Sequence, residues 1–351
     1  MDLSKYHNKG LTGIENLGNT CFLNSCMQVL NHTYELNHFL DSDSYKRFLK
    51  PNSVDSDILA EWNDLRNVMW SGNGVVTPKK FVFNIQRVAA IKDKDIFTGY
   101  AQNDMPEFLL FMIDCMHNSL ARSVNMRISG NVQNGIDEMA VKCYENLKTT
   151  YSKEYSEIMD MYYGLYVSEI ISKDGRIRHV MKPESYFILD LPISDGTRIA
   201  TNLYGCFDLF VRPEFLEGDN AWLNEKTGKK EDIRKQISFW NFPKIMVIVL
   251  KRFSPDGQHK LNQLVDFPLE GLDLSRYVRG YNPSSYIYDL FGICNHSGGP
   301  MGGHYTAFVK NSQNNWHHYN DRNVESVADP KTIITPMSLS LIHISEPTRP
   351  Y

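Results

Sequence analysis

The chain has 351 residues, with 37 basic and 41 acidic side chains, a formal net charge of −4 and 42% apolar residues. This composition excludes a disordered or fibrous protein, and the length allows two or three lobes or one large irregular domain. The longest apolar run, 245–250, is far shorter than the ~20 residues of a membrane span, and residues 1–10 lack a hydrophobic secretory segment. We therefore expect a cytoplasmic or nuclear protein that does not bind membranes. Its near-balanced charge also predicts no nucleic-acid partner.

The predicted elements change character along the chain. Residues 11–120 are expected to be mainly helical, because apolar side chains recur at helical spacing there. Residues 121–163 again favour helix, with a weaker pattern. The second half has short β-rich runs bounded by Pro, Gly and Asn, and they lie at 186–191, 245–250, 286–293 and 304–309. The sequence therefore predicts an α+β fold in which helices come first and an antiparallel sheet follows.

The two ends of the chain are interpreted separately. Residues 1–10 are expected to be an N-terminal extension. Residues 338–351 (SLSLIHISEPTRPY) resemble read-through of a sequencing adapter or a vector scar, so they are left out of the predicted fold. A native ending is the alternative, since IHIS could form a strand.

The six cysteines, at positions 21, 26, 115, 143, 206 and 294, form no C-x-x-C pair. A thiolate zinc ribbon and a thioredoxin-type dithiol are therefore excluded. Disulfides are not expected in a reducing compartment. Each cysteine is then either a small buried hydrophobic residue or a reactive thiolate, and burial is the more common state.

Cys21 lies in the segment 13–30, GIENLGNTCFLNSCMQVL. Gly18 and Asn19 predict a turn, Asn19 or Thr20 could cap the helix that follows, and Cys21 falls in its first turn. The helix dipole and free N–H groups there favour a thiolate, so Cys21 is the candidate nucleophile. A buried packing role explains the segment equally well. Cys26, on the apolar face, is expected to be a core residue.

A second helix start lies in the segment 102–116, QNDMPEFLLFMIDCM. Asp104 followed three residues later by Glu107, with Pro106 between them, matches a capping box. Capping alone explains the segment, and a functional role for Asp104 is the less common alternative.

The third informative segment, 296–327, predicts a hairpin around His304. If Val309 pairs with Asn315, paired residue numbers sum to 624 and His304 lies opposite Asn320. An amide so placed can orient a histidine that acts as a base. A register shifted by one residue would bring Asp321 opposite instead, and the sequence leaves that choice open.

Four glycines, at 298, 299, 302 and 303, precede His304. They leave its approach free of side chains, so that a substrate backbone could pass. A flexible loop beside a core histidine is the alternative. Together, a cysteine at a helix start, a histidine and a possible orienting partner match the pattern of thiol catalysis.

These segments together resemble the ubiquitin-specific proteases, papain-like cysteine proteases that remove ubiquitin. GLTGIENLGNTCFLNSCMQVL is similar to their Cys box, QNDMPEFLLFMID to their Q-x-D-x-x-E-F helix, and GGHYTAFVKN with WHHYND to their His box. The resemblance covers about residues 10–327. It implies a papain-like α+β fold with a helical thumb (about 11–160) and a β-rich palm with antiparallel β fingers (about 161–330), in a catalytic domain of residues 11–337.

The resemblance also implies roles for five residues. Cys21 is the expected nucleophile, His304 its base, and Asn320 the orienting residue, with Asp321 as the acidic neighbour that can assist or substitute. Asn16 matches the side chain that donates to the oxyanion.

The expected substrate is ubiquitin joined to other proteins, cut after its C-terminal glycine, with no cofactor. Asp104 matches a carboxylate that holds the extended ubiquitin tail, and the substrate-binding set is expected to be Gln102, Asp104, Gly302, Gly303 and Tyr305. An inactive ubiquitin-binding scaffold and a protease for a ubiquitin-like modifier are the alternatives.

Two departures from the family pattern carry further expectations. Many members hold zinc in the fingers through two C-x-x-C pairs, but the place of the second pair is Asn224 and Thr227 here, and 164–175 has no cysteine. We therefore expect no metal site and fingers held by strand pairing alone. The strand that usually closes the domain after the His box is not recognised, and it would be truncated if residues 338–351 come from an adapter.

Overall fold

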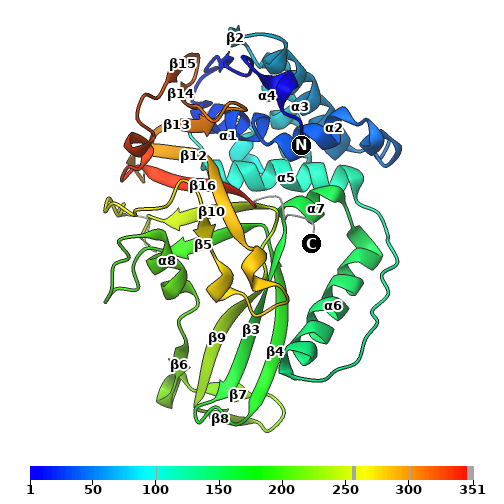
Figure 1. Ribbon diagram of the computed structural model, residues 1–351, viewed down its shortest axis with the longest axis vertical. Helices are drawn as coiled ribbons and strands as arrows, with labels where there is room; N and C mark the ends of the chain where they lie inside the picture. The colour runs from blue at the N-terminus through cyan, green and yellow to red at the C-terminus, as the bar shows by residue number, and fades with distance from the viewer. Residues whose placement is uncertain (100, 255–257, 301, 346–351) are drawn as a thin grey trace.

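The computed structural model describes residues 1–99, 101–254, 258–300 and 302–345. Its helices precede most of its strands along the chain (Figure 1). The α-helices are α1 (Cys21–Asn31), α2 (Tyr34–Asp41), α3 (Val54–Ser71), α4 (Lys79–Ile91), α5 (Met105–Leu120), α6 (Gly135–Glu154), α7 (Glu157–Tyr162) and α8 (Leu203–Phe210). The strands are β1 (Gly13–Ile14), β2 (Val75–Val76), β3 (Gly164–Ser172), β4 (Arg178–Tyr186), β5 (Ile188–Pro192), β6 (Glu214–Leu216), β7 (Trp222–Asn224), β8 (Lys229–Glu231), β9 (Ile233–Asn241), β10 (Ile245–Lys251), β11 (Leu272–Asp273), β12 (Ile287–Gly299), β13 (Gly302–Lys310), β14 (Trp316–Asn320), β15 (Asn323–Ser326) and β16 (Ser338–Ser345).

Helices α1 to α5 form one lobe at the top of Figure 1. Every residue of α1 is buried, because this helix packs between α5 and the strands β12 and β13. A helix that is enclosed on all sides is held rigidly in place, which suits a helix that carries functional groups. None of the helices in the described ranges is long and apolar enough to cross a membrane.

The central layer is an eight-stranded sheet in the order β15-β14-β13-β12-β16-β10-β5, with β11 paired to β12. The pairs are antiparallel except for β10 with β5. One hydrophobic core lies between this sheet and the thumb helices, and a second lies on its other face around α8. The predicted α+β class, with helices first and strands after, is confirmed.

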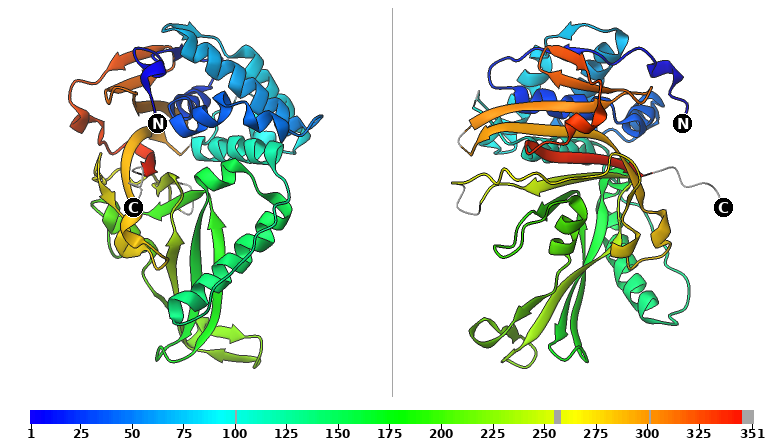
Figure 2. Two further views of the ribbon diagram at one scale, coloured as in Figure 1. Left: turned by 45° about the vertical axis from the view of Figure 1, so that its right-hand side comes forward. Right: turned by 60° about the vertical axis from the view of Figure 1, so that its left-hand side comes forward.

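The strands β4, β3, β9 and β6 form a separate antiparallel sheet that extends away from the helical lobe, with α6 lying along it (Figures 1 and 2). These are the fingers expected from the sequence. The helix α6 packs through Met139, Ala140 and Cys143 onto Leu165 and Trp240. The expectation of helix throughout 121–163 is wrong for 121–134, which has no helix before α6 begins.

The end of the described chain corrects the treatment of residues 338–351. Ser338–Ser345 form β16, which lies between β10 and β12 in the middle of the sheet, so excluding this segment from the fold is wrong. The apolar side chains of Leu339, Leu341 and Ile342 are buried in the two cores on the faces of the sheet. A strand at this position forms backbone hydrogen bonds with both β10 and β12. Without it, the buried N–H and C=O groups of those two strands would lack partners. The expectation of a missing closing strand is therefore also wrong, while residues 346–351 lie outside the described ranges.

One side chain of β16 is poorly matched to this position. His343 is 0% exposed, and neither of its ring nitrogens has a hydrogen-bond partner among the described residues. A buried polar group without a partner costs about 1–3 kcal/mol. We therefore expect His343→Leu, which keeps a similar volume, to raise the free energy of unfolding by about that amount.

Urea titration at pH 7.5 would measure this change. The matched control is His38→Leu at an exposed position, which should leave the midpoint nearly unchanged. A lower midpoint for His343→Leu would show that the imidazole stabilises the sheet.

The tip of the fingers carries a polar cluster around Asn224 and Thr227, the positions that the sequence resemblance aligned with a C-x-x-C pair. Asn224 Nδ2 donates to Glu231 Oε1 at 2.8 Å, and the Thr227 hydroxyl donates to the same oxygen at 3.1 Å. His179 lies 3.4 Å from the other oxygen of Glu231 and packs against Trp222. The expectation that strand pairing alone holds the fingers is therefore wrong. Within the described ranges, no group of three or more His, Cys, Asp or Glu side chains could hold a metal ion.

Candidate active site

The loop before α1 places Cys21 at the first position of that helix. Gly18 and Asn19 have positive φ values of 104° and 55°, which makes the sharp turn predicted from the sequence. Capping by Thr20 is wrong, because its side chain makes no cap hydrogen bond. The Thr20 hydroxyl instead accepts from Leu17 N and donates to Asn16 Oδ1. It therefore fixes the loop that presents Asn16.

The Cys21 thiol is only 4% exposed. Burial raises its pKa above the ordinary value, and the negative charge of Asp321 adds to this effect. The backbone N–H groups of Tyr305, Phe22 and Cys21 itself act in the opposite direction. The expectation that the helix start makes the thiol more acidic is therefore wrong for the resting structure, because desolvation outweighs the helix terminus. A nearby base is needed to generate the thiolate.

His304 on β13 is oriented by Asn320 at the end of β14. The ring Nε2–H of His304 donates to Asn320 Oδ1 at 2.7 Å, which leaves Nδ1 as the nitrogen that can accept a proton. Residues paired across these strands sum to 626, as in Ala307 with Tyr319, so the predicted sum of 624 is wrong by two. Because side chains alternate with period two, an even shift keeps His304 and Asn320 on the same face.

Asp321 does not orient the histidine in this structure. It has a left-handed φ of 51° in the turn after β14, and its carboxylate faces α1. Asn16 Nδ2 donates to Asp321 Oδ2 at 3.0 Å, and Asn24 Nδ2 donates to Asp321 Oδ1 at 2.7 Å. The choice left open by the sequence is therefore decided in favour of Asn320.

Gly302 and Gly303 are held by Gln102 from the thumb. Gln102 Nε2 donates to Gly303 O at 3.0 Å, and Gly303 N donates to Gln102 Oε1 at 2.8 Å. A Cβ atom on Gly303 would lie 2.1 Å from Ser297 O, and one on Gly302 would lie 2.5 Å from Gln102 Oε1. Glycine is thus required here by close packing within the protein itself.

Two residues near this turn were not found from the sequence. Lys260 donates to His296 O and, at 3.3 Å, to Gly298 O, so it holds the strand end that leads to the glycine turn. His296 is buried and packs on the ring of Tyr305, with 4.7 Å between ring centroids. Tyr305 is itself 6% exposed, so its ring is buried against His296. A single lysine in a polar segment carries no sequence signal for such a contact.

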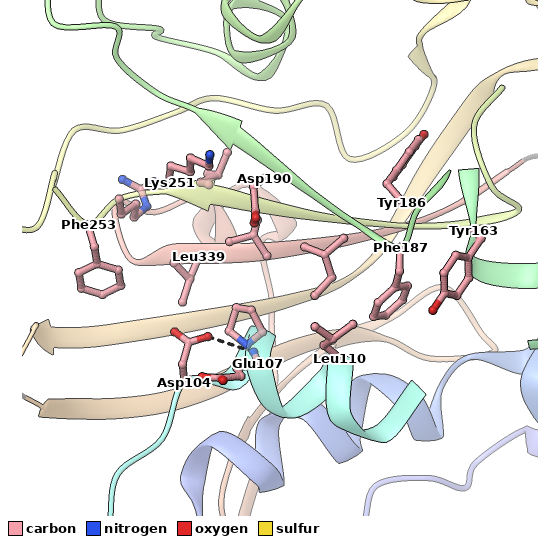
Figure 3. A pocket seen from close by; sticks show the side chains of 15 residues that line it. Asp104, Glu107, Leu110, Tyr163, Tyr186, Phe187, Asp190, Lys251, Phe253 and Leu339 are labelled. Atoms are coloured by element: carbon pink, nitrogen blue, oxygen red, sulfur yellow. Dashed lines mark hydrogen bonds between the residues drawn. The ribbon is translucent and has the colours of Figure 1, made fainter. Parts of the chain in front are cut away.

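Asp104 lines both a large groove and a smaller pocket beside Gln102 and Gly302. Its carboxylate accepts from Glu107 N at 3.1 Å, which confirms the predicted helix cap. It also lines a groove of about 580 Å³ between the start of α5 and the palm strands. Figure 3 shows Asp104 and Glu107 on the helix side, and Asp190, Lys251 and Phe253 on the sheet side. Desolvation in the groove raises the pKa of Asp104, and the charges of Glu107 and Asp190 raise it further.

The other five cysteines are also free and buried. Burial raises the pKa of each of these thiols. Cys21, His304, Asn320 and Asn16 therefore form a single candidate centre, in which two lobes bring together a thiol, a base, an orienting amide and an oxyanion donor.

A helical lobe that carries the thiol and a sheet that carries the histidine and asparagine match the papain-like arrangement expected from the sequence. The family model described as "Ubiquitin carboxyl-terminal hydrolase" matches residues 12–347. The chain belongs to this family, which confirms the resemblance noted in its sequence.

Individual relatives agree with the family assignment. The chain is 35% identical to human ubiquitin carboxyl-terminal hydrolase 2 over 96% of its own length and 54% of the relative. It is 34% identical to the protein of the same name from Gallus gallus, of which it covers 92%. The chain thus spans about half the length of several of its relatives.

A solved structure confirms the fold. The SAGA Ubp8/Sgf11/Sus1/Sgf73 deubiquitinase module bound to ubiquitin aldehyde matches with a TM-score of 0.74 at 22% identity, over 99% of this chain and 72% of the matched chain.

Proposed function

We propose that this chain is a cysteine-type deubiquitinase that hydrolyses isopeptide or peptide bonds after the C-terminal glycine of ubiquitin. The observation that carries the proposal is the bond from His304 Nε2 to Asn320, on strands that pack against the helix beginning at Cys21. Membership of the ubiquitin carboxyl-terminal hydrolase family supports ubiquitin as the substrate.

The chemistry follows from the available atoms. His304 Nδ1 takes the thiol proton, and Cys21 Sγ attacks the carbonyl carbon of the terminal glycine. The negative charge that develops on the carbonyl oxygen accepts hydrogen bonds from Asn16 Nδ2 and from the Cys21 backbone N–H. The carbon–nitrogen bond then breaks as His304 returns its proton to the leaving lysine amine. Water, activated by the same histidine, hydrolyses the thioester and restores the thiol.

The groove beside the site suits an extended peptide tail. It is lined by three carboxylates, from Asp104, Glu107 and Asp190, by the basic residues Lys251 and Arg252, and by aromatic side chains that include Tyr163 and Phe187 (Figure 3). Such a lining suits an extended tail that carries both charged and apolar side chains. Gln102, Gly302 and Gly303 then form the narrow end of the path toward Cys21. The proposed partners are ubiquitin and ubiquitinated proteins.

The test is incubation of the folded chain with a ubiquitin probe that carries a C-terminal electrophile, followed by peptide mapping. We expect one adduct, on Cys21, together with turnover of a fluorogenic ubiquitin amide. Ubiquitin binding without turnover would instead support the inactive scaffold. Labelling only by probes built on ubiquitin-like modifiers would reassign the substrate, and an adduct on any other cysteine would contradict the assigned nucleophile.

A further inference from the structure

Asn24 is a buried amide one turn after Cys21 on α1. It is only 2% exposed, and its Nδ2 donates to Asp321 Oδ1 at 2.7 Å. The same nitrogen lies 3.4 Å from Ile14 O and 3.5 Å from Glu15 O, directly before Asn16. The side chain thus links three parts of the molecule: the nucleophile helix, the turn after β14 and the loop that presents the oxyanion donor.

The carboxylate of Asp321 connects Asn24 to Asn16, because each of its two oxygens accepts a hydrogen bond from one of these amides. Asp321 Oδ2 accepts from Asn16 Nδ2 at 3.0 Å, so one hydrogen of that amide is bound and the second remains available for an oxyanion. The carbonyl side of Asn16 is fixed as well, because Oδ1 accepts from Gly18 N and Thr20 N. The orientation of the Asn16 amide therefore depends on where the Asp321 carboxylate lies.

The other end of the Asn24 amide is unfavourable for stability. Asn24 Oδ1 is buried and has no hydrogen-bond partner among the described residues. A buried acceptor without a partner destabilises a fold, and an apolar side chain at this position would avoid the loss. Proteins retain such destabilising groups mainly at functional sites, so the buried amide of Asn24 beside the candidate nucleophile indicates a functional role.

We infer that Asn24 is a positioning residue, which acts through Asp321 to hold the Asn16 amide where the oxyanion develops. This inference rests on the proposed function. It assigns Asn24 no contact with the substrate: the residue sets the direction of a donor that must be in place before the charge forms. Loss of Asn24 should therefore lower kcat, while substrate binding, measured as KM, stays unchanged.

The first experiment compares Asn24→Ala with Gln28→Ala on the same helix. Gln28 is a matched control, because it is 1% exposed, donates through Nε2 to Thr12 O at 2.8 Å, and also has a buried side-chain oxygen without a described partner. We expect Asn24→Ala to lower kcat about tenfold or more without lowering Tm. Gln28→Ala should leave kcat unchanged.

The second experiment uses Asn24→Asp, which places two carboxylates in contact. Such a pair shares one proton, and the new carboxyl group can donate to Asp321 only when it is protonated. The ratio of the variant's kcat to that of the original chain should therefore fall as pH rises, and a purely structural role would not give this dependence. Adding Asp321→Asn supplies an amide that can donate to the new carboxylate and accept from Asn16, so the double variant should recover much of the activity.

The outcomes separate this inference from the function on which it rests. If the original chain neither forms the ubiquitin adduct nor turns over the amide, the proposed function fails. If the original chain is active and Asn24→Ala retains its kcat, or loses it only in parallel with Tm, the positioning role is overturned. A rise in KM at constant kcat would also overturn it, since that result would indicate substrate binding.

Discussion

Replacing His304 with Gln is expected to lower kcat/KM for a ubiquitin amide by about 10² to 10⁴. Gln keeps a polar side chain of similar length but cannot take a proton. The effect should be large because burial raises the pKa of Cys21 in the resting structure, so little thiolate exists without the base. Steady-state kinetics with the fluorogenic amide between pH 6 and 9 would measure the loss. The residual activity of the variant should rise with pH as the thiol ionises without assistance.

The neighbouring residues Asn320 and Asp321 should differ in their effects. Asn320 accepts from His304, so Asn320→Ala should slow the alkylation of Cys21 by iodoacetamide, a reaction that needs the oriented base but no oxyanion donor. Asp321 bonds to Asn16 and Asn24, so Asp321→Ala should lower kcat without slowing that alkylation. The reverse pattern would show that Asp321 orients His304 during turnover, contrary to the resting geometry.

Acidification from pH 7.5 to pH 5 is expected to lower the free energy of unfolding by several kcal/mol. Burial lowers the pKa of His343 to about 3, and the pKa values of His32 and His296 to about 4. In the unfolded chain each histidine titrates near 6.5, so below that pH the unfolded state binds more protons. The stabilisation is complete above about pH 6.5 and is lost as the pH falls toward 4. Each histidine should contribute about 2 kcal/mol of loss at pH 5.

Buried carboxyl groups partly oppose this trend. Burial raises the pKa of Glu35 and Asp114, so these groups bind protons first in the folded state and stabilise it as the pH falls through their range. Urea midpoints at pH 7.5 and pH 5 would give the net change. His343→Leu should remove about a third of the loss, because it removes one of the three histidines. Equal losses for the original chain and for His343→Leu would show that the His343 imidazole is not buried in solution.

Local sequence patterns correctly predicted three features of the candidate site: a turn, a helix cap and a pair of side chains on one sheet face. The turn at Gly18 and Asn19 followed from two residues that tolerate positive φ, and Cys21 follows that turn directly. The cap formed by Asp104 could be predicted because the carboxylate and the Glu107 N–H that donates to it are only three residues apart in the sequence. The pairing of His304 with Asn320 was also predicted, since even an error of two in register leaves both side chains on one face.

Two of the failed predictions concern residues whose environment depends on distant parts of the chain. The segment 338–345 was set aside for its resemblance to an adapter, although its alternating apolar residues fit a strand. The acidity of Cys21 was predicted from the helix terminus alone, which a sequence shows, whereas its burial depends on strands far along the chain.

The sequence by itself indicated the family and the α+β order of elements, and it singled out Cys21 and His304 as the candidate nucleophile and base, because the motifs that carry these signals are each contained in a short segment. Only the tertiary structure decided that Asn320 orients His304 while Asp321 bonds to Asn16 and Asn24, and that Lys260 and Gln102 hydrogen-bond to the glycine turn. These contacts join residues up to about 300 positions apart, and their geometry depends on how a helix packs against a sheet. Such packing is set by the whole core, so no local pattern in the chain encodes it.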